Sequence, residues 1–405
     1  MRICLIWDSE YPWDVRIEKV SRSFLASGHE VHLVCRNRTA RVRHEEDKGL
    51  HIHRLPTAGR HLDSLASFPF FGNPVWIHAI HRVVRDLKLE AILVRDIPMA
   101  LAGLLIGKVC QIPCYVDMAE PYPEMLAGYK ALQRTSASQA IINCFLRNPS
   151  FAQKVESLAT HLAKHIFPVS DEMRDNLIRK GVPAHKITVV HNTPALSDFP
   201  PAALDLNQNA PRYREGRKQL TATYIGDLTE ARGLPLVIEA MAQLKRTASQ
   251  SFRLVIIGGG RHERHVRQLI KDRALEDIVS CTGWVPHRQA YHLMTQADIG
   301  LIPHLGTAHN HLTVPNKIFD YMAGHLPVVS ANLSSLDRIL SATQAGLVFK
   351  DYTAECLVET MTHLCEPSLR FEMGRNGRKA FEHEYNWERD FSHMQRIVTG
   401  MGPQL

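Results

Sequence analysis

The chain has 405 residues, of which 45% are hydrophobic and 22% are charged, and its net charge at pH 7 is +7. This length is enough for two or three domains with full cores, the composition is that of an ordinary globular protein, and no apolar run is long enough to span a membrane. The mild basic excess suits small anionic ligands or an anionic membrane surface, and because no RNA-binding or helix-turn-helix signature accompanies it, we expect no nucleic-acid partner.

Cysteine and histidine usage argues against disulfides and against a metal. The eight cysteines are scattered, and the opening apolar run ends at Asp8, too early for a signal sequence, so we expect a cytoplasmic protein with reduced thiols. His304, His309 and His311 lie close together but lack an H-E-x-x-H or similar helical spacing. We therefore predict polar-loop or structural histidines and no metal site.

The first half of the chain alternates strands with helices. Apolar runs predict strands at residues 2–7, 30–35, 50–55, 91–94, 113–117, 166–169 and 186–190. Helical spacing of apolar residues predicts helices at 15–27, 74–87, 97–110 and 171–180, with one or two more within 126–165. Strands separated by helices indicate a parallel sheet with right-handed crossovers.

A second series begins after a break in this alternation. Residues 193–219 are polar and proline-rich and are interpreted as a linker. Further strands are predicted at 222–225, 253–257, 278–281, 298–302, 327–330 and 346–349. The fold class is therefore α/β, with two similar domains at 1–200 and 201–385 whose parallel sheets face each other across a cleft that is the natural ligand site.

Residues 303–330 join a strand end, a polar loop, a short helix and another strand. The loop at 304–316 leads into the predicted helix at its N-terminus, where unpaired backbone N–H groups favour anions. Lys317 and Asp320 follow directly, so this segment suits a phosphate joined to a hydroxylated ring. The alternative is that the loop and helix only cover a sheet end, with Lys317 and Asp320 as a solvated pair.

Other residues of the second half also follow strands, where parallel sheets bind ligands. They are Gly226, Arg232, Gly258, Gly259, Trp284 and Val285. Arg232 starts a helix, where a cation is disfavoured unless an anion lies between them, so we expect it to bind phosphate rather than to be a surface residue. The glycines permit close backbone approach or form a tight turn, and they are not the dinucleotide pattern G-x-G-x-x-G. Trp284 either contacts a nucleobase or packs in the core.

Polar side chains gather after the strands of the first half. They are Arg95, Asp96, Asp117, Glu120, Tyr122 and Glu124. Carboxylates clustered at a strand end are costly unless they bind something polar, and the hydroxyls of a sugar acceptor would qualify. A solvated loop is the alternative.

Motifs along nearly the whole length resemble the GT-B glycosyltransferases of the family 4 type, which retain anomeric configuration. They are YPWDVRIEKVSRSFLASGHEVHLV, VRDIPMALAG, VDMAEPYPEM, HN at 191–192, YIGDLTEARGL, LVIIGGG, GWVP, VPNKIFDYMAGHLPVV and YNWERD. The resemblance implies two Rossmann-like domains, with an acceptor in the first and a nucleotide-sugar donor in the second. It also implies that residues 386–405 form a helix that crosses back to the first domain.

The resemblance also implies roles for individual residues. Arg232 matches the diphosphate-binding cation, and Asp320 matches the second acid of an E-x7-E motif, which holds the ribose. Base contacts are expected at Trp284 and Val285. Sugar-phosphate contacts are expected at Thr313, Val314, Asn316 and Lys317, and acceptor contacts at Asp14, Arg16, Arg95, Asp96, Asp117, Glu120 and Tyr122.

The sequence departs from the family pattern at three positions. The first acid of E-x7-E falls at Leu312, the usual Gly-Arg is Gly226-Asp227, and a frequent histidine falls at Ala119. These departures indicate a subfamily pattern, with a degenerate inactive copy as the alternative.

The predicted activity is transfer of a sugar to an acceptor hydroxyl without a metal ion. Arg232 and Lys317 would stabilise the leaving diphosphate. Asp117 or Glu120 would orient the acceptor. No cofactor is expected, and a UDP-sugar is favoured over a GDP-sugar as donor. A lipid-linked acceptor would place residues 67–76 and 126–165 on the cytoplasmic face of a membrane, against the alternative of ordinary core and solvated surface. The rival functions are a nucleotide-sugar 2-epimerase and a non-catalytic nucleotide-sugar-binding subunit.

Overall fold

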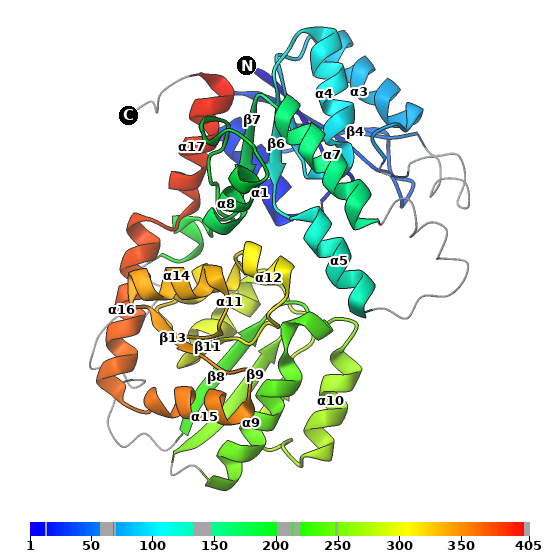
Figure 1. Ribbon diagram of the computed structural model, residues 1–405. Coiled ribbons are helices and arrows are strands. Elements are labelled where there is room, and N and C mark those ends of the chain that lie inside the picture. The colour runs from blue at the N-terminus through cyan, green and yellow to red at the C-terminus, as the bar shows by residue number, and fades with distance from the viewer. Residues whose placement is uncertain are drawn as a thin grey trace. The chain divides into compact units, whose positions relative to one another are not determined.

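The computed structural model describes residues 1–12, 14–56, 68, 70–132, 148–200, 213, 219–247 and 250–400. The chain divides into two compact units (Figure 1). Unit 1 comprises Met1–Asn192 and Asp390–Leu405, and unit 2 comprises Thr193–Arg389.

Unit 1 is built on a seven-stranded sheet with the order β3-β4-β2-β1-β5-β6-β7. All neighbours are parallel except the edge pair β3 and β4, which is antiparallel. Its strands are β1 (Arg2–Ile6), β2 (Glu30–Cys35), β3 (His44–Asp47), β4 (Leu50–Arg54), β5 (Ala91–Arg95), β6 (Cys114–Met118) and β7 (His165–Pro168). Its helices include α1 (Val15–Ala26), α3 (Pro74–Asp86), α4 (Ala100–Cys110), α5 (Tyr122–Leu132), α7 (Pro149–Leu162) and α8 (Asp171–Arg179).

Unit 2 is built on a six-stranded, fully parallel sheet with the order β10-β9-β8-β11-β12-β13. Its strands are β8 (Gln219–Ile225), β9 (Ser251–Ile257), β10 (Val279–Cys281), β11 (Ile299–Ile302), β12 (Val328–Ala331) and β13 (Gly346–Phe349). Its helices are α9 (Leu234–Thr247), α10 (Glu263–Asp272), α11 (His287–Thr295), α12 (Ala308–Leu312), α13 (Lys317–Ala323), α14 (Ser334–Thr343), α15 (Ala354–His363) and α16 (Pro367–His383), with α17 (Trp387–Thr399) leading into unit 1.

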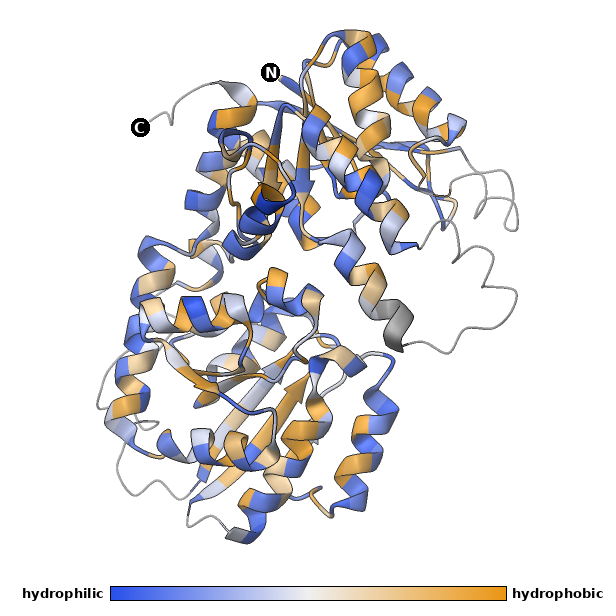
Figure 2. Cartoon of the chain, viewed as in Figure 1, coloured by the Kyte–Doolittle hydropathy of each residue, from blue (hydrophilic) through white to orange (hydrophobic). Residues whose placement is uncertain are grey.

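The central strands explain why the apolar runs of the sequence fold this way. Residues of β1, β5, β11 and β12 are buried along almost their whole length, as expected for parallel strands covered by helices on both faces. The helices instead bury one stripe; in α1, for example, Ile17, Val20 and Phe24 face inward. Figure 2 shows this mixture of apolar and polar residues on the helices. Among the described residues, no helix combines the length and apolarity required to cross a bilayer.

The division between the units falls at residue 192 rather than at the predicted residue 200. Phe199 explains the difference, because its ring packs on Tyr291 and Phe381 of unit 2, with centroids 4.5 and 6.2 Å away. The Trp387 N–H also donates to the carbonyl of Pro194, at 3.0 Å. Residues after 192 therefore belong to the second core. Most of the predicted linker lies outside the described residues.

Some local structure differs from the sequence prediction. The predicted strand at 186–190 forms only an isolated bridge, between Ile166 and Ile187. The polar strand β3 was not predicted, because it carries no apolar alternation and is held by its antiparallel pairing with β4. The predicted loop at 304–316 contains α12, whose first turn is capped by the hydroxyl of Thr307.

Candidate functional site

The loops after β8 and β9 lie backbone to backbone in unit 2. The Gly226 N–H donates to the carbonyl of Ile257 at 2.9 Å, and the Leu228 N–H donates to that of Gly259, also at 2.9 Å. At Gly258, where φ is +129°, a Cβ would collide with the carbonyl oxygen of Gly226. Glycine is therefore required for this close approach. Together the two loops form a glycine surface at the ends of β8 and β9, in which Gly258 and Gly259 are buried and Gly259 lies against the side chains of Glu263 and Trp284.

Trp284 stands beside this surface. Its side chain is 69% exposed, so the alternative of core packing is wrong. A Cβ at Gly259 would lie 2.9 Å from the indole ring. Val285, by contrast, packs partly against the unit 2 core. An exposed indole offers a flat face on which a planar ring can stack.

Lys317 is a buried cation at the start of α13. Its side chain is 8% exposed, and its ammonium lies 3.9 Å from the centroid of the Tyr224 ring. A Cβ built on Gly226 would lie 3.3 Å from the same nitrogen. Burial and the charge of Arg232 lower the pKa of Lys317 well below its ordinary value, against the opposing charges of Asp320 and Asp227. Among the described residues, Lys317 has no ion pair within 4.0 Å. An anion at this position would relieve that cost.

Arg232 ends the 3₁₀ turn Glu230–Arg232, just before Gly233, whose φ is +70°. This turn is held against the loop after β11, since the Leu305 N–H donates to the carbonyl of Ala231 at 3.0 Å. Within the described ranges, the guanidinium has no ion-pair partner. The charge of Arg232 thus acts on Lys317, and neither group forms an ion pair within 4.0 Å in the described structure.

His304 joins these two cations and was not predicted as a site residue. Its imidazole is fully buried, and neither ring nitrogen has a hydrogen-bond partner within the described structure. Burial, followed by the charges of Lys317 and Arg232, lowers its pKa well below the ordinary value, so the ring is neutral at pH 7. Its position directly after β11 is the signal that could have identified it, because the same rule selected Arg232 and Trp284.

The rest of the 313–320 segment offers fewer ligand groups than predicted. Val314 points into the core, and the carbonyl of Thr313 accepts the hydroxyl of Ser335 at 2.6 Å. Asn316 is exposed at the helix start. The N–H groups of Ile318 and Phe319 already donate to backbone carbonyls in their own turn. The cationic group that this segment offers is therefore the Lys317 side chain rather than free N–H groups of Ile318 and Phe319.

Asp320 lies one turn after Lys317 and is half-buried. Its Oδ1 accepts the hydroxyl of Tyr291 at 2.9 Å. The Tyr291 ring in turn packs on His287, with centroids 4.1 Å apart. The hydrogen bond from Tyr291 thus holds the Asp320 carboxylate against α11.

In unit 1, Arg16 and Asp117 form a buried ion pair instead of an open acceptor site. Their side chains are 1% and 2% exposed. Arg16 Nε donates to Asp117 Oδ2 at 2.8 Å, and the guanidinium also donates to the carbonyls of Val190 and His191. Both side chains thus join α1 to β6 and to the segment at residues 190–191, and the acceptor contact of Arg16 and Asp117 stays a prediction.

Asp96 is the residue of this unit that stands out. Its backbone has φ 62° and ψ 175°, a conformation that side chains other than glycine rarely adopt. Its Oδ1 accepts the N–H groups of Ala119 and Glu120, at 2.7 and 3.2 Å. Burial raises the pKa of Asp96 to about 7 against the opposing charge of Arg95, whose guanidinium lies 2.9 Å away. A strained backbone with a perturbed carboxyl is typical of functional sites.

The neighbours of Asp96 come from several strand ends. Asp14 caps α1 through the Ile17 N–H, at 2.8 Å, and its other oxygen lies 3.7 Å from Arg95. Glu120 and Tyr122 are half-buried, and burial followed by the charge of Asp96 raises the pKa of Tyr122 well above its ordinary value. Asp8 was not predicted; burial raises its pKa, opposed by Arg95. Its position directly after β1 is the signal that was available.

Two family models match this chain. The glycosyl transferase 4-like domain covers residues 14–193, and the domain of the glycosyl transferases group 1 covers residues 219–366. Together with the two parallel-sheet units, these matches show that the chain belongs to the GT-B glycosyltransferases of the family 4 type.

Curated relatives agree with this class. The chain is 28% identical over 225 residues to the colanic acid biosynthesis glycosyltransferase WcaL of Escherichia coli strain K12, covering 55% of this chain and 53% of the relative. It is 29% identical over 203 residues to the amylovoran biosynthesis glycosyltransferase AmsK of Erwinia amylovora, covering 50% and 47%. The chain thus spans about half the length of the curated relatives it matches. These relatives give no support to the epimerase alternative.

Solved structures share the fold over the whole chain. Sucrose-phosphate synthase from Thermosynechococcus elongatus superposes with a TM-score of 0.76 at 16% identity, covering 99% of this chain and 98% of that one. HepE from Anabaena, solved with UDP, gives 0.70 at 12% identity, covering 99% and 100%. WaaG, a glycosyltransferase of lipopolysaccharide biosynthesis, gives 0.69 at 14% identity, covering 98% and 100%.

Proposed function

We propose that this protein transfers a sugar from a nucleotide-diphosphate sugar to an acceptor hydroxyl. The observation that carries the proposal is the group formed by Lys317, Arg232 and His304 at the strand ends of unit 2, in which neither cation has an ion pair within 4.0 Å among the described residues and the imidazole is neutral. A buried cation without a counter-ion is costly, so it is retained where a ligand supplies the charge. A diphosphate is such a ligand.

The same groups account for the chemistry. The barrier to transfer is the separation of the anomeric carbon from the diphosphate, which gains negative charge as the bond breaks. Donors fixed at that position stabilise the growing charge, and removal of one such group costs about 3–4 kcal/mol. Lys317 and Arg232 would do this without a metal ion, and a front-face attack by the acceptor would give retention of configuration.

The nucleoside end would lie on the glycine surface beside Trp284. Its exposed indole would stack on the base, and Asp320 would accept the ribose hydroxyls. UDP is the nucleotide we favour, because the structural neighbour HepE was solved with UDP and with UDP-glucose.

Asp96, rather than Asp117, would orient the acceptor hydroxyl in unit 1. It carries the raised pKa and the strained backbone, whereas Asp117 is enclosed by Arg16. Glu120 and Tyr122 lie close enough to take part in the same network. The relatives WcaL and AmsK act in polysaccharide biosynthesis, and we extend that class of acceptor to this chain.

A lipid-linked acceptor is favoured by an apolar surface on unit 1. Large hydrophobic side chains project from α4 and α7, namely Leu105, Val109, Phe151, Leu158 and Leu162, each between 38% and 60% exposed. Lys108 and Lys154 are exposed on the same helices. Apolar residues flanked by lysines suit the interface of an anionic membrane. Trp76, within the segment first considered for this role, is instead fully buried.

A ligand panel tests the donor site. Thermal shifts would be measured with UDP, GDP, dTDP and their sugars on the wild type, Arg232→Ala and the matched surface variant Lys271→Ala. A nucleotide at about 100 times its Kd should add ~2.7 kcal/mol to the free energy of unfolding. We expect UDP or its sugar to stabilise the wild type and Lys271→Ala but not Arg232→Ala. If no nucleotide stabilises the wild type, the donor-site proposal fails.

A second candidate is a non-catalytic nucleotide-sugar-binding subunit. Leu312, in the place of an acid, is a half-buried side chain at the end of α12, and Asp227 stands where the family usually has arginine. Donor hydrolysis separates the two functions. Release of sugar from the stabilising donor supports the enzyme, whereas binding without turnover in any acceptor mixture supports the subunit.

A further inference from the structure

The edge of the unit 1 sheet carries a face of histidines and glutamates away from the proposed transfer residues. The pairing register places His32 of β2 opposite His51 of β4, and His51 opposite Glu46 of β3. Because side chains alternate along a strand, the neighbours two positions away project from the same face. The shared face therefore carries Glu30, His32, His44, Glu46, His51 and His53.

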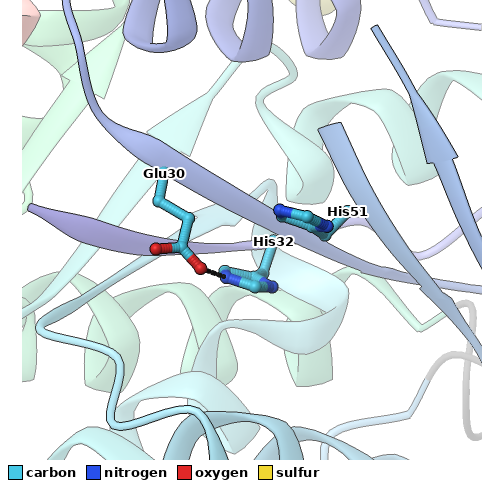
Figure 3. A group of neighbouring side chains, drawn as sticks. All are labelled: Glu30, His32 and His51. Atoms are coloured by element: carbon cyan, nitrogen blue, oxygen red, sulfur yellow. Dashed lines mark hydrogen bonds and ion pairs between the residues drawn. The ribbon is translucent and has the colours of Figure 1, made fainter. Parts of the chain in front are cut away.

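Glu30, His32 and His51 come together within this face. One ligating atom from each lies within 4.8 Å of the other two. His32 Nε2 is 2.8 Å from Glu30 Oε1, and the rings of His32 and His51 are stacked with centroids 4.8 Å apart. Figure 3 shows the Glu30 carboxylate turned toward the His32 ring, with His51 beside it on the neighbouring strand.

The remaining residues orient the imidazoles of this group. His32 Nδ1 lies 3.1 Å from His53 Nε2, and His53 Nδ1 lies 3.2 Å from His44 Nδ1. His51 Nδ1 faces Glu46 Oε2 at 3.9 Å. His32 and His51 thus each direct Nδ1 at an outer partner, which leaves their Nε2 atoms for a shared ligand. Metal-binding histidines show this arrangement, in which the outer partner fixes the ring and its tautomer.

We propose that Glu30, His32 and His51 bind a zinc ion. Two imidazole nitrogens and a carboxylate oxygen are suitable donors for Zn²⁺, and a water molecule would complete a tetrahedral set. The ion would replace the proton that His32 now shares with Glu30. His32, which is 3% exposed, supplies the rigid base of the site, while Glu30 and His51 remain accessible to an entering ion.

Binding requires no change in the charge of the histidine chain. The Nε2 proton of His32 is released to solvent, and the proton on His53 Nε2 moves to His32 Nδ1. The proton on His44 Nδ1 then moves to His53 Nδ1, and solvent supplies one to His44 Nε2, so each ring remains neutral and only the tautomers change.

The site would tie the sheet edge together. Among the described strands, β3 pairs with β4 alone, and its residues contribute outer partners rather than ligands. A bound ion would fix β2 to β4 directly, and Glu46 and His44 would attach β3 to the bound set. We therefore expect zinc to slow amide exchange across residues 44–54 in particular.

Titration with Zn²⁺ alone, on protein without a histidine tag, tests this site. We expect saturable binding with one ion per chain by calorimetry and tetrahedral absorption bands when Co²⁺ is substituted. His51→Ala and Glu30→Gln should weaken binding about 100-fold. Glu46→Gln, which removes only an outer partner, should weaken it about 10-fold. The control His363→Ala changes an exposed helix histidine in unit 2 and should bind as the wild type does.

The accessible variants keep the test interpretable, because Glu30, Glu46 and His51 are not core residues. Circular dichroism of each metal-free variant checks that its fold is retained. Absence of saturable zinc binding, or equal affinity in wild type and His51→Ala, would overturn the proposal. Binding lost in His51→Ala but unchanged in both glutamate variants would show an adventitious histidine contact only, and would also overturn it.

Discussion

The charged residues that follow the strands differ between the two units in how their charges are balanced. In unit 1 the charges are matched: Arg16 is enclosed by Asp117, and Arg95 lies between Asp14 and Asp96. In unit 2, burial and the charge of Arg232 lower the pKa of Lys317, and the buried, neutral His304 offers no negative charge to compensate. The first cluster is complete as it stands, whereas the second has a deficit of negative charge.

This difference separates charged residues that stabilise the fold, in unit 1, from charged residues for which we propose a ligand, in unit 2. A buried pair such as Arg16–Asp117 is costly to break, while the removal of an uncompensated cation relieves strain in the free protein. Charge changes of the same kind should therefore have opposite effects on stability in the two units. Four experiments follow from this contrast, in order of decreasing effect.

Arg16→Met should be the most damaging change to stability. It leaves Asp117 buried without a partner, and the expected loss is about 3–5 kcal/mol of unfolding free energy, measured by denaturant titration. The double variant Arg16→Met with Asp117→Leu removes both charges and should recover much of that loss. A single-variant loss below about 1 kcal/mol would contradict the buried-pair assignment.

Asp96→Asn should reduce sugar transfer about 100-fold while improving stability above neutral pH. Because the folded pKa of Asp96 is about 7, well above its ordinary value, its stabilising contribution is present below about pH 4 and is lost as the pH rises through 7. Asparagine cannot ionise, so the melting temperature of the Asp96→Asn variant at pH 8 should exceed that of the wild type. Wild-type transfer should rise with pH through about 7, and a flat profile would exclude an ionised Asp96.

Trp284→Ala should weaken nucleotide binding about 10-fold, or about 1.4 kcal/mol, because a base–aromatic stack contributes ~1–3 kcal/mol. Since the ring is 69% exposed, the melting temperature of the free protein should hardly change. Trp284→Phe is the matched control and should retain most of the affinity in a calorimetric titration. Equal affinities for all three proteins would show that the base binds elsewhere.

Lys317→Met should raise the stability of the free protein by about 0.5–2 kcal/mol, since it removes a buried cation that has no ion-pair partner in the described structure. The same variant should no longer be stabilised by a nucleotide. Lys271→Met, on the exposed face of α10, is the control and should leave both properties unchanged. A lower melting temperature for Lys317→Met would show that the ammonium is already compensated in the free protein.

Much of the fold was predictable because buried parallel strands appear in the sequence as continuous apolar runs. Runs such as residues 91–94 and 299–302 are apolar throughout, and each is buried throughout in the structure. The polar strand β3 has no apolar run, because its formation depends on pairing with β4. The boundary between the two units could not be predicted either, since Phe199 packs on Phe381, which lies far away in the sequence.

For the site, the rule that ligands follow strands located Arg232, Trp284 and Asp96 but could not show their environments. Asp117 and Asp96 look alike in sequence, and only the arrival of Arg16 from α1 distinguishes the enclosed carboxylate from the perturbed one. The zinc candidates were missed for a related reason. The alternating histidines at 51 and 53 indicate one face of a strand. The pairing of β2 with β4, which brings His32 opposite His51, cannot be predicted from the spacing of nearby residues.

The last helix sets the order in which the protein can be completed during synthesis. Unit 1 is discontinuous: Phe391 packs on Phe24 with ring centroids 4.9 Å apart, and the hydroxyl of Tyr115 donates to the carbonyl of Ile397 at 3.4 Å. A domain at the start of a chain commonly folds while the rest is still being translated. Here the first domain emerges from the ribosome without its closing helix, and its surface around Phe24 and Tyr115 stays uncovered until unit 2 has been made. The N-terminal domain is therefore the last to be finished, although it is the first to appear.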